Sequence, residues 1–144
     1  MTADLLAAVE RFFDEEILPR HRDWVAHVSG RKGTPAFVAD LKARARAAGL
    51  WNLGLPDRMS NRAFAPIAEI MGRLPWAPEV FNAQAPDVPN MIMLQHAASA
   101  DQKKRWLDPL LDGRVRSAFG MTEPDVASSD ATNIVTTLRR APSP

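Results

Sequence analysis

The sequence contains no cysteine, which excludes disulfide bonds, thiolate catalysis and cysteine-based zinc sites. It also lacks any uncharged apolar stretch approaching the roughly 18 residues that a membrane helix requires. The N-terminus does not show the basic region followed by an apolar run that marks a signal peptide. These absences predict a soluble, cytoplasmic protein that has no membrane partner.

Neither sign of charge is in excess, because 18 lysines and arginines face 17 aspartates and glutamates. The net charge of +1 gives no electrostatic reason to expect a nucleic-acid partner. Lys42, Arg44 and Arg46 are close together on a predicted helix, but without interleaved aromatic residues they fit a solvated helix face. We therefore expect no binding to nucleic acid.

Several catalytic patterns are also missing. The chain has no Gly-x-Ser-x-Gly, P-loop or Gly-x-Gly-x-x-Gly motif, and its three histidines do not share a predicted face. Ser128, Ser129 and Asp130 could suggest a hydrolytic triad with a histidine, but no tight strand-to-helix turn surrounds them. We therefore predict no metal site and no catalytic residue in these 144 residues.

The residues that are present predict a mainly α protein. A chain of 144 residues with 46% hydrophobic content can bury one core, and its 12 prolines indicate short, sharply ended helices. Apolar residues at helical spacing predict helices over about 2–28 with a bend at Pro19, 35–48 after a Thr34 cap, 61–71 after a Ser60 cap, 90–97, and 100–112 after a capping box at Ser99. The β-branched run from Ile134 to Leu138 predicts a strand.

The most distinctive stretch is the loop at 117–130, which follows a short apolar run. Pro124 restricts Glu123 to extended backbone, while the serines and aspartates can tie the loop to its own backbone. Loops at strand ends often carry ligand sites in α/β proteins. An ordinary connection between helices and a sheet explains the residues equally well, so both readings stay open.

Residues 119–124, Phe-Gly-Met-Thr-Glu-Pro, followed by Ser129 and Asp130, resemble the flavin-contacting signature of acyl-CoA dehydrogenases. The longer run over 122–134 is similar to the ACAD10/ACAD11-like subgroup, which carries an extra residue between the proline and the serine-aspartate pair. The resemblance implies an N-terminal helical domain of the acyl-CoA dehydrogenase fold over 1–116. It also implies the first strands of a truncated β-domain, with the flavin-contacting loop, over 117–138, and a disordered tail over 139–144.

The resemblance further implies FAD as cofactor and assigns residues to it. The family pattern places the cofactor against Phe119, Gly120, Met121, Thr122, Ser128 and Ser129. Backbone amides in such a segment can hydrogen-bond the electron-rich edge of the flavin ring. Ser129 is also expected to contact the substrate, and Met91 borders the family's acyl-chain cavity, although core packing explains a methionine there equally well.

By this resemblance the reaction is α,β-desaturation of an acyl-CoA thioester, with an electron-transfer flavoprotein as partner and a homo-oligomer as the full-length form. The resemblance implies that the family's carboxylate base is absent from this chain, and the residue matching Glu123 is not that base. We therefore expect the 144-residue chain to be inactive alone. The alternative is a non-catalytic helical assembly module, or a remnant, that pairs with a separately encoded C-terminal part.

Overall fold

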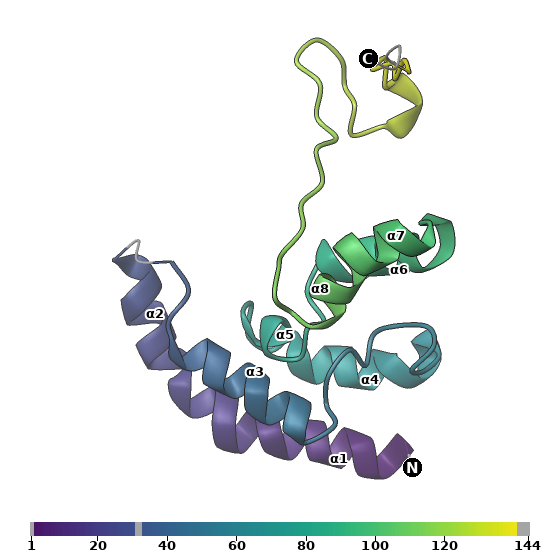
Figure 1. The fold of residues 1–144 in the computed structure, drawn as a ribbon. Coiled ribbons are helices and arrows are strands. Elements are labelled where there is room, and N and C mark those ends of the chain that lie inside the picture. Colours follow the sequence, from purple (N-terminus) through teal and green to yellow (C-terminus); the bar gives the residue numbers. More distant parts are fainter. Residues whose placement is uncertain (1, 31–32, 141–144) are drawn as a thin grey trace.

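The structure is a computed structural model that describes residues 2–30 and 33–140 (Figure 1). The described part is helical and contains no strand. Its α-helices are α1 (Thr2–Phe12), α2 (His21–Ser29), α3 (Phe37–Ala47), α4 (Asn61–Met71), α5 (Ala77–Val80), α6 (Asp87–Ala97), α7 (Ala100–Gln102) and α8 (Asp108–Leu111). Two π-helical turns, Phe13–Ile17 and Lys103–Leu107, and two 3-10 turns, Leu18–Arg20 and Ala131–Asn133, complete it.

Two of the helical rods contain a widened turn just before a proline. The π turn Phe13–Ile17 precedes Pro19 between α1 and α2, and the π turn Lys103–Leu107 precedes Pro109 between α7 and α8. Proline lacks the backbone donor and its ring collides with the carbonyl four residues earlier, so the chain must widen or bend there. The predicted long helix with a bend at Pro19 is confirmed in this form.

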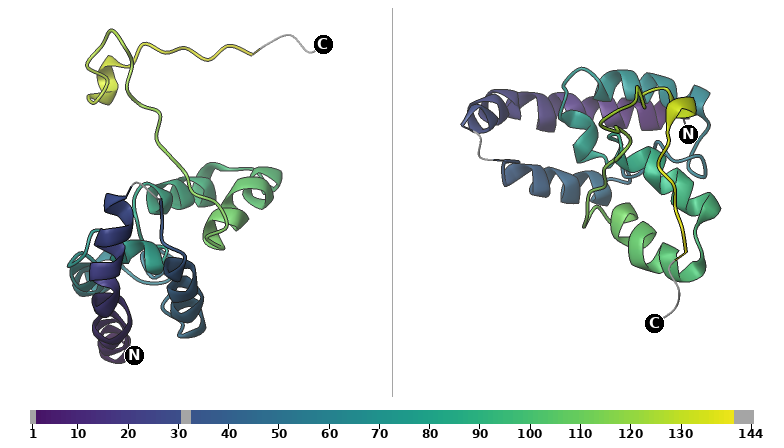
Figure 2. Two further views of the ribbon diagram at one scale, coloured as in Figure 1. Left: turned by 90° about the vertical axis from the view of Figure 1, so that its left-hand side faces the viewer. Right: turned by 90° about the horizontal axis from the view of Figure 1, so that it is seen from above.

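The main core lies between α1, α3, α4 and α5, which pack side by side in Figures 1 and 2. Its fully buried side chains include Val9, Phe13, Ile17, Val38, Ile67, Val80 and Phe81. Trp76 stacks on Trp24 with ring centroids 5.9 Å apart. A second cluster of Leu55, Met91, Leu107 and Leu110 joins α6 to α8. Both clusters form the helical body.

Of the three helix caps predicted from the sequence, two are present in the structure and one is not. Ser60 accepts the amide of Ala63 and caps α4, and the capping box between Ser99 and Gln102 is present in both directions. The Thr34 cap is wrong, because α3 begins at Phe37 after the uncapped residue Ala36.

The strand predicted over 134–138 is also wrong, and the described part of 117–138 contains none of the first β-domain strands that the resemblance implies. In the described chain these segments are not paired with any strand, and Leu138 is 99% exposed. A strand is stable only when a neighbour satisfies its backbone groups. Here the amides of Val135 and Thr136 donate instead to the side chain of Glu123.

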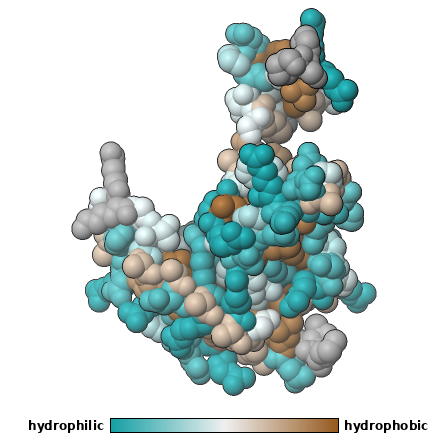
Figure 3. Space-filling view, viewed as in Figure 1, coloured by the Kyte–Doolittle hydropathy of each residue, from teal (hydrophilic) through white to brown (hydrophobic). Residues whose placement is uncertain are grey.

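After α8 the chain leaves the helical body as an extended arm, residues 114–140, which Figures 1 and 2 show from three sides. The space-filling view shows this arm standing away from the helices, with apolar side chains along it (Figure 3). Its large exposed hydrophobic residues are Val115, Phe119, Met121, Ile134, Val135 and Leu138. Residues 141–144 of the predicted tail lie outside the described residues.

Candidate functional site

The base of the arm is fixed to the helical body by the carboxylate of Asp87, the first residue of α6. Asp87 is 1% exposed and its Oδ1 accepts both the amide and the hydroxyl of Ser117, each at 2.6 Å. Its Oδ2 accepts Arg116 Nε at 2.6 Å and Gln84 Nε2 at 2.5 Å. Burial alone would raise the pKa of Asp87, but these donors outweigh it and hold the pKa below its ordinary value.

Arg116 extends this anchor into a row of alternating charges. Its Nη1 lies 3.2 Å from Glu79 on α5, and the same glutamate oxygen accepts Lys42 Nζ from α3 at 2.7 Å. The row Lys42–Glu79–Arg116–Asp87 therefore connects three helices to the start of the arm. Neither Asp87 nor Arg116 was singled out in the sequence, because the helix predicted over 90–97 begins after Asp87 and no local pattern links that aspartate to residues about 30 positions away.

Next to this anchor is a groove of about 480 Å³ between α6, the turn Lys103–Leu107 and the arm. Its apolar walls come from Met93, Leu94, Trp106, Val115 and Ala118. Half of the Trp106 surface is exposed, so this wall of the groove is open to solvent.

Met91, the predicted substrate contact on α6, lies outside this groove. It is 0% exposed and packs with Leu55, Leu107 and Leu110 in the second core cluster. Of the predicted site residues, Met91 is therefore in the helical body, whereas all the others are on the arm.

The tip of the arm is closed by its own side chains. Ser128, which is buried, accepts the amide of Glu123 at 2.7 Å. The Glu123 carboxylate accepts the amides of Val135 and Thr136 at 3.0 and 2.8 Å, and also the Thr136 hydroxyl. The Thr136 hydroxyl and then the Val135 amide lower the pKa of Glu123 below its usual range. Glu123 is thus engaged in holding the loop.

Asp130 plays a similar local part at the start of the last 3-10 turn. Its Oδ1 accepts the amide and the hydroxyl of Thr132 at 3.0 and 2.7 Å. These two bonds, the hydroxyl first, lower the pKa of Asp130.

Between the fixed base and the closed tip lie four of the residues predicted to contact flavin, whereas Ser128 and Ser129 lie in the tip itself. Phe119 is 63% exposed, and Gly120, Met121 and Thr122 are exposed beside it on one extended segment. No hydrogen bond among the described residues uses the backbone amides of Phe119, Met121 or Thr122. Ser129 is exposed, whereas its neighbour Ser128 faces into the loop. The segment therefore leaves backbone donors and an aromatic ring exposed.

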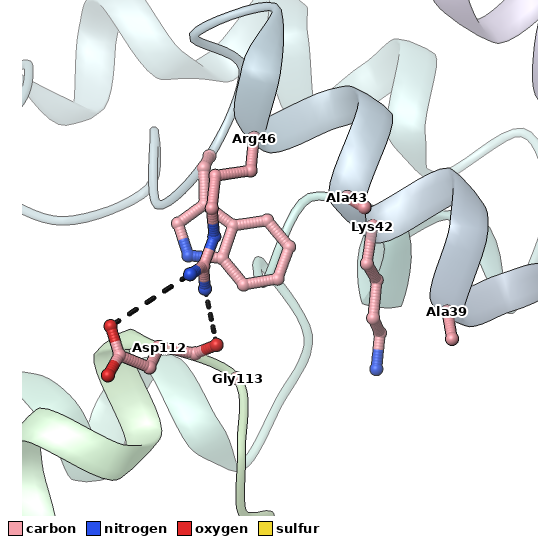
Figure 4. Close-up of a pocket in the computed structure, with 7 residues that line it drawn as sticks. Ala39, Lys42, Ala43, Arg46, Asp112 and Gly113 are labelled. Atoms are coloured by element: carbon pink, nitrogen blue, oxygen red, sulfur yellow. Dashed lines mark hydrogen bonds and ion pairs between the residues drawn. The ribbon is translucent and has the colours of Figure 1, made fainter.

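A second pocket, of about 290 Å³, lies between α3 and the end of α8 (Figure 4). Arg46 lies over the ring of Trp51 at 4.6 Å and reaches the carbonyl of Asp112, with the Asp112 carboxylate 4.0 Å away. Lys42 lines the same pocket and is paired with Glu79. These contacts hold α3 against α8, so we assign this pocket a structural role.

The described residues contain no group of three or more potential metal-ligating side chains. Within the same part of the chain, no helix has both the length and the apolar character needed to cross a membrane.

Comparisons with known proteins agree with the resemblance. The family described as acyl-CoA dehydrogenase, N-terminal domain, matches residues 2–114. Acyl-CoA dehydrogenase family member 11 of Homo sapiens is 44% identical over 145 residues, covering 95% of this chain and 19% of the relative. Family member 10 of Mus musculus is 40% identical over 141 residues, covering 90% of this chain and 13% of the relative.

A solved structure of a candidate acyl-CoA dehydrogenase from Mycobacterium abscessus has the same fold. It matches with a TM-score of 0.82 and 52% identity, over 91% of this chain and 36% of that chain. The chain thus spans about a third of the solved relative and less than a fifth of the two curated relatives. The mainly α fold class is confirmed, and the chain belongs to the acyl-CoA dehydrogenase family, whose N-terminal helical domain it carries.

Proposed function

We propose that this chain supplies the helical domain and one wall of the flavin site of an FAD-dependent acyl-CoA dehydrogenase. The proposal rests on the exposed segment 119–122. Its backbone amides donate to no other described residue, although Ser117 before it is bonded to Asp87 and Glu123 after it is bonded to Ser128. Such donors suit the electron-rich edge of a flavin ring, where charge accumulates on reduction. FAD, when bound, supplies the oxidant for the Cα–Cβ bond of the acyl thioester.

The arm residues have distinct parts in this proposal. The amides of Phe119, Met121 and Thr122, with the Thr122 hydroxyl, donate to the ring edge, and Gly120 allows close approach because it has no side chain. Ser128 holds the loop through the Glu123 amide. Ser129 is exposed beside it and offers a hydroxyl to the cofactor's pyrophosphate or to the pantetheine of the substrate.

The base that removes the α-proton comes, in this proposal, from outside these 144 residues. A general base needs a free carboxylate within reach of the proton and a pKa near the working pH. Asp87, Glu123 and Asp130 are each engaged by donors that lower their pKa values. This supports a non-catalytic role for all three carboxylates. That the isolated chain is inactive remains an expectation from the family resemblance.

For the substrate we propose an acyl-CoA thioester whose tail lies near α6. Met91 remains the predicted contact; it is buried in the same cluster as Leu110, which lines the groove. An electron-transfer flavoprotein and a homo-oligomeric full-length form are the proposed partners. These follow from the family to which the chain belongs.

A first experiment tests the isolated chain. FAD is titrated into the purified 144-residue protein while the visible spectrum and flavin fluorescence are recorded. Because the flavin-contacting segment is exposed on one side, we expect weak or unsaturable binding. Tight, saturable binding would contradict the proposal that the remaining walls of the site come from elsewhere.

A second experiment tests the activity. The matching 36% of the Mycobacterium abscessus protein is replaced by this chain, and FAD content and acyl-CoA-dependent dye reduction are measured. We expect a flavin-loaded, active chimera, with the unmodified Mycobacterium abscessus protein as reference. A folded chimera of the reference oligomeric size that lacks flavin or activity would instead favour the non-catalytic assembly module.

A further inference from the structure

The arm leaves the helical body at one point, and the contacts there determine where its exposed segment lies. Residues 118–122 have no described hydrogen bond to the helices. Ser117 and Arg116, immediately before them, are bonded to Asp87 through three donors. Since an extended chain rises about 3.3 Å per residue, Phe119 lies within about 7 Å of Ser117 along the arm.

Asp87 is itself tied to the core. It opens α6, and Met91, one turn later on the same helix, is fully buried between α6 and α8. Asn90, also on α6, donates Nδ2 to the Ser117 hydroxyl at 2.8 Å, so this hydroxyl accepts from one α6 residue and donates to another. The arm therefore begins from a fixed position relative to the packed helices.

We propose that Asp87 is a positioning residue for the flavin-contacting segment, which it holds in place through Ser117 and Arg116. A misplacement of about 1 Å at a reacting centre can cost on the order of 100-fold in rate, so a buried anchor so close to the segment acts on the chemistry without touching it. This inference rests on the proposed function, because it assumes that residues 119–122 face the flavin.

The principal variant is Asp87→Asn, which keeps the side-chain size and removes the negative charge that pairs with Arg116. In the isolated chain, hydrogen-exchange mass spectrometry of peptides covering 114–122 should show faster exchange at Ser117 in the variant, while peptides of α1 and α4 are unchanged. This readout depends on neither flavin nor activity. Unchanged exchange at Ser117 would contradict the proposal that Asp87 holds the start of the arm.

The second readout uses the flavin-loaded chimera. Asp87→Asn should lower the rate of flavin reduction by about tenfold or more and shift the flavin midpoint potential, with KM for acyl-CoA changed less than about twofold. Glu79→Gln is the matched control, because it removes one partner of Arg116 and leaves both Ser117 bonds intact. The control should keep most of the rate.

Further outcomes separate the possibilities. If Asp87→Asn loses stability but its flavin-loaded fraction keeps the parental rate and potential, the residue is merely structural and the inference fails. If Asp87→Asn does not fold, Ser117→Ala takes its place, with Ser117→Thr expected to restore the rate by restoring the hydroxyl. An inactive parental chimera would overturn the proposed function, whereas an active parent with unaffected variants would overturn only the positioning role.

Discussion

Asn82 donates its side-chain amide to the side-chain oxygen of Asn52 at 2.7 Å, and both asparagines have a positive φ. The same Asn82 amide reaches the carbonyl of Leu110 at 2.9 Å, while Trp51 Nε1 donates to Leu111 O at 2.7 Å. Together these hydrogen bonds join the loop after α3 and the turn after α5 to the end of α8. They therefore fix the helix end from which the arm departs.

Replacing Asn82 by alanine should destabilise the protein by about 2–3 kcal/mol. The change removes a buried donor from a carbonyl acceptor and places alanine at a φ that asparagine tolerates better. Urea unfolding followed by circular dichroism measures the difference. Asn61→Ala, at an exposed helix start, should stay within about 0.5 kcal/mol of the parent; equal losses in both variants would contradict the assigned role.

Gly113 and Gly120 form a second matched pair. A Cβ at Gly113, which has φ +64°, would lie 2.7 Å from the ring of Trp51, whereas one at Gly120 would meet nothing within 4 Å. Gly113→Ala should therefore cost about 2 kcal/mol, and Gly120→Ala about 0.5 kcal/mol or less. Thermal unfolding of both variants checks this, and a Gly113→Ala protein as stable as its parent would argue against the close packing of Trp51.

The stability contributed by Asp87 should depend on pH. Its folded-state pKa lies below the ordinary value of 3.8, so this stability is present above pH 3.8 and is lost as pH falls through the lower folded-state pKa. At neutral pH Asp87→Asn should cost about 1–3 kcal/mol, a modest value because Arg116 is half exposed and screened by water.

The measurement for Asp87 is urea unfolding of parent and variant from pH 7 to pH 3. The difference between the two unfolding free energies should shrink below pH 3.8, since asparagine does not titrate. A difference that stays constant over the whole range would show that the carboxylate charge does not contribute.

Thr122→Val tests the flavin wall. In the chimera, loss of the hydroxyl donor should raise the activation free energy of flavin reduction by about 1–3 kcal/mol if the bond to the flavin is buried. Thr132→Val is the control, because the Thr132 hydroxyl bonds Asp130 within the loop. Stopped-flow reduction compares the two, and an unchanged rate and potential in Thr122→Val would remove that residue from the site.

Features encoded by neighbouring residues were predicted well from the sequence. The capping box at Ser99 and Gln102 and the whole extent of α4 follow from residues a few positions apart, so local chemistry determines them. The strand over 134–138 failed because strand pairing depends on a distant partner, and in its place Glu123 takes the backbone donors. The bond of Asp87 to Ser117 spans 30 residues and is equally invisible in a local pattern.

The anchored base and closed tip of the arm have an entropic consequence. Ordering one residue of free backbone costs about 1–2 kcal/mol, so a fully loose arm would resist binding strongly. Here Ser117 is held to α6 and Glu123 is held within the closed tip, so residues 118–122 are the segment between them that must adapt. The arm is thus preorganised, and a planar ligand would have to immobilise little more than the segment it contacts.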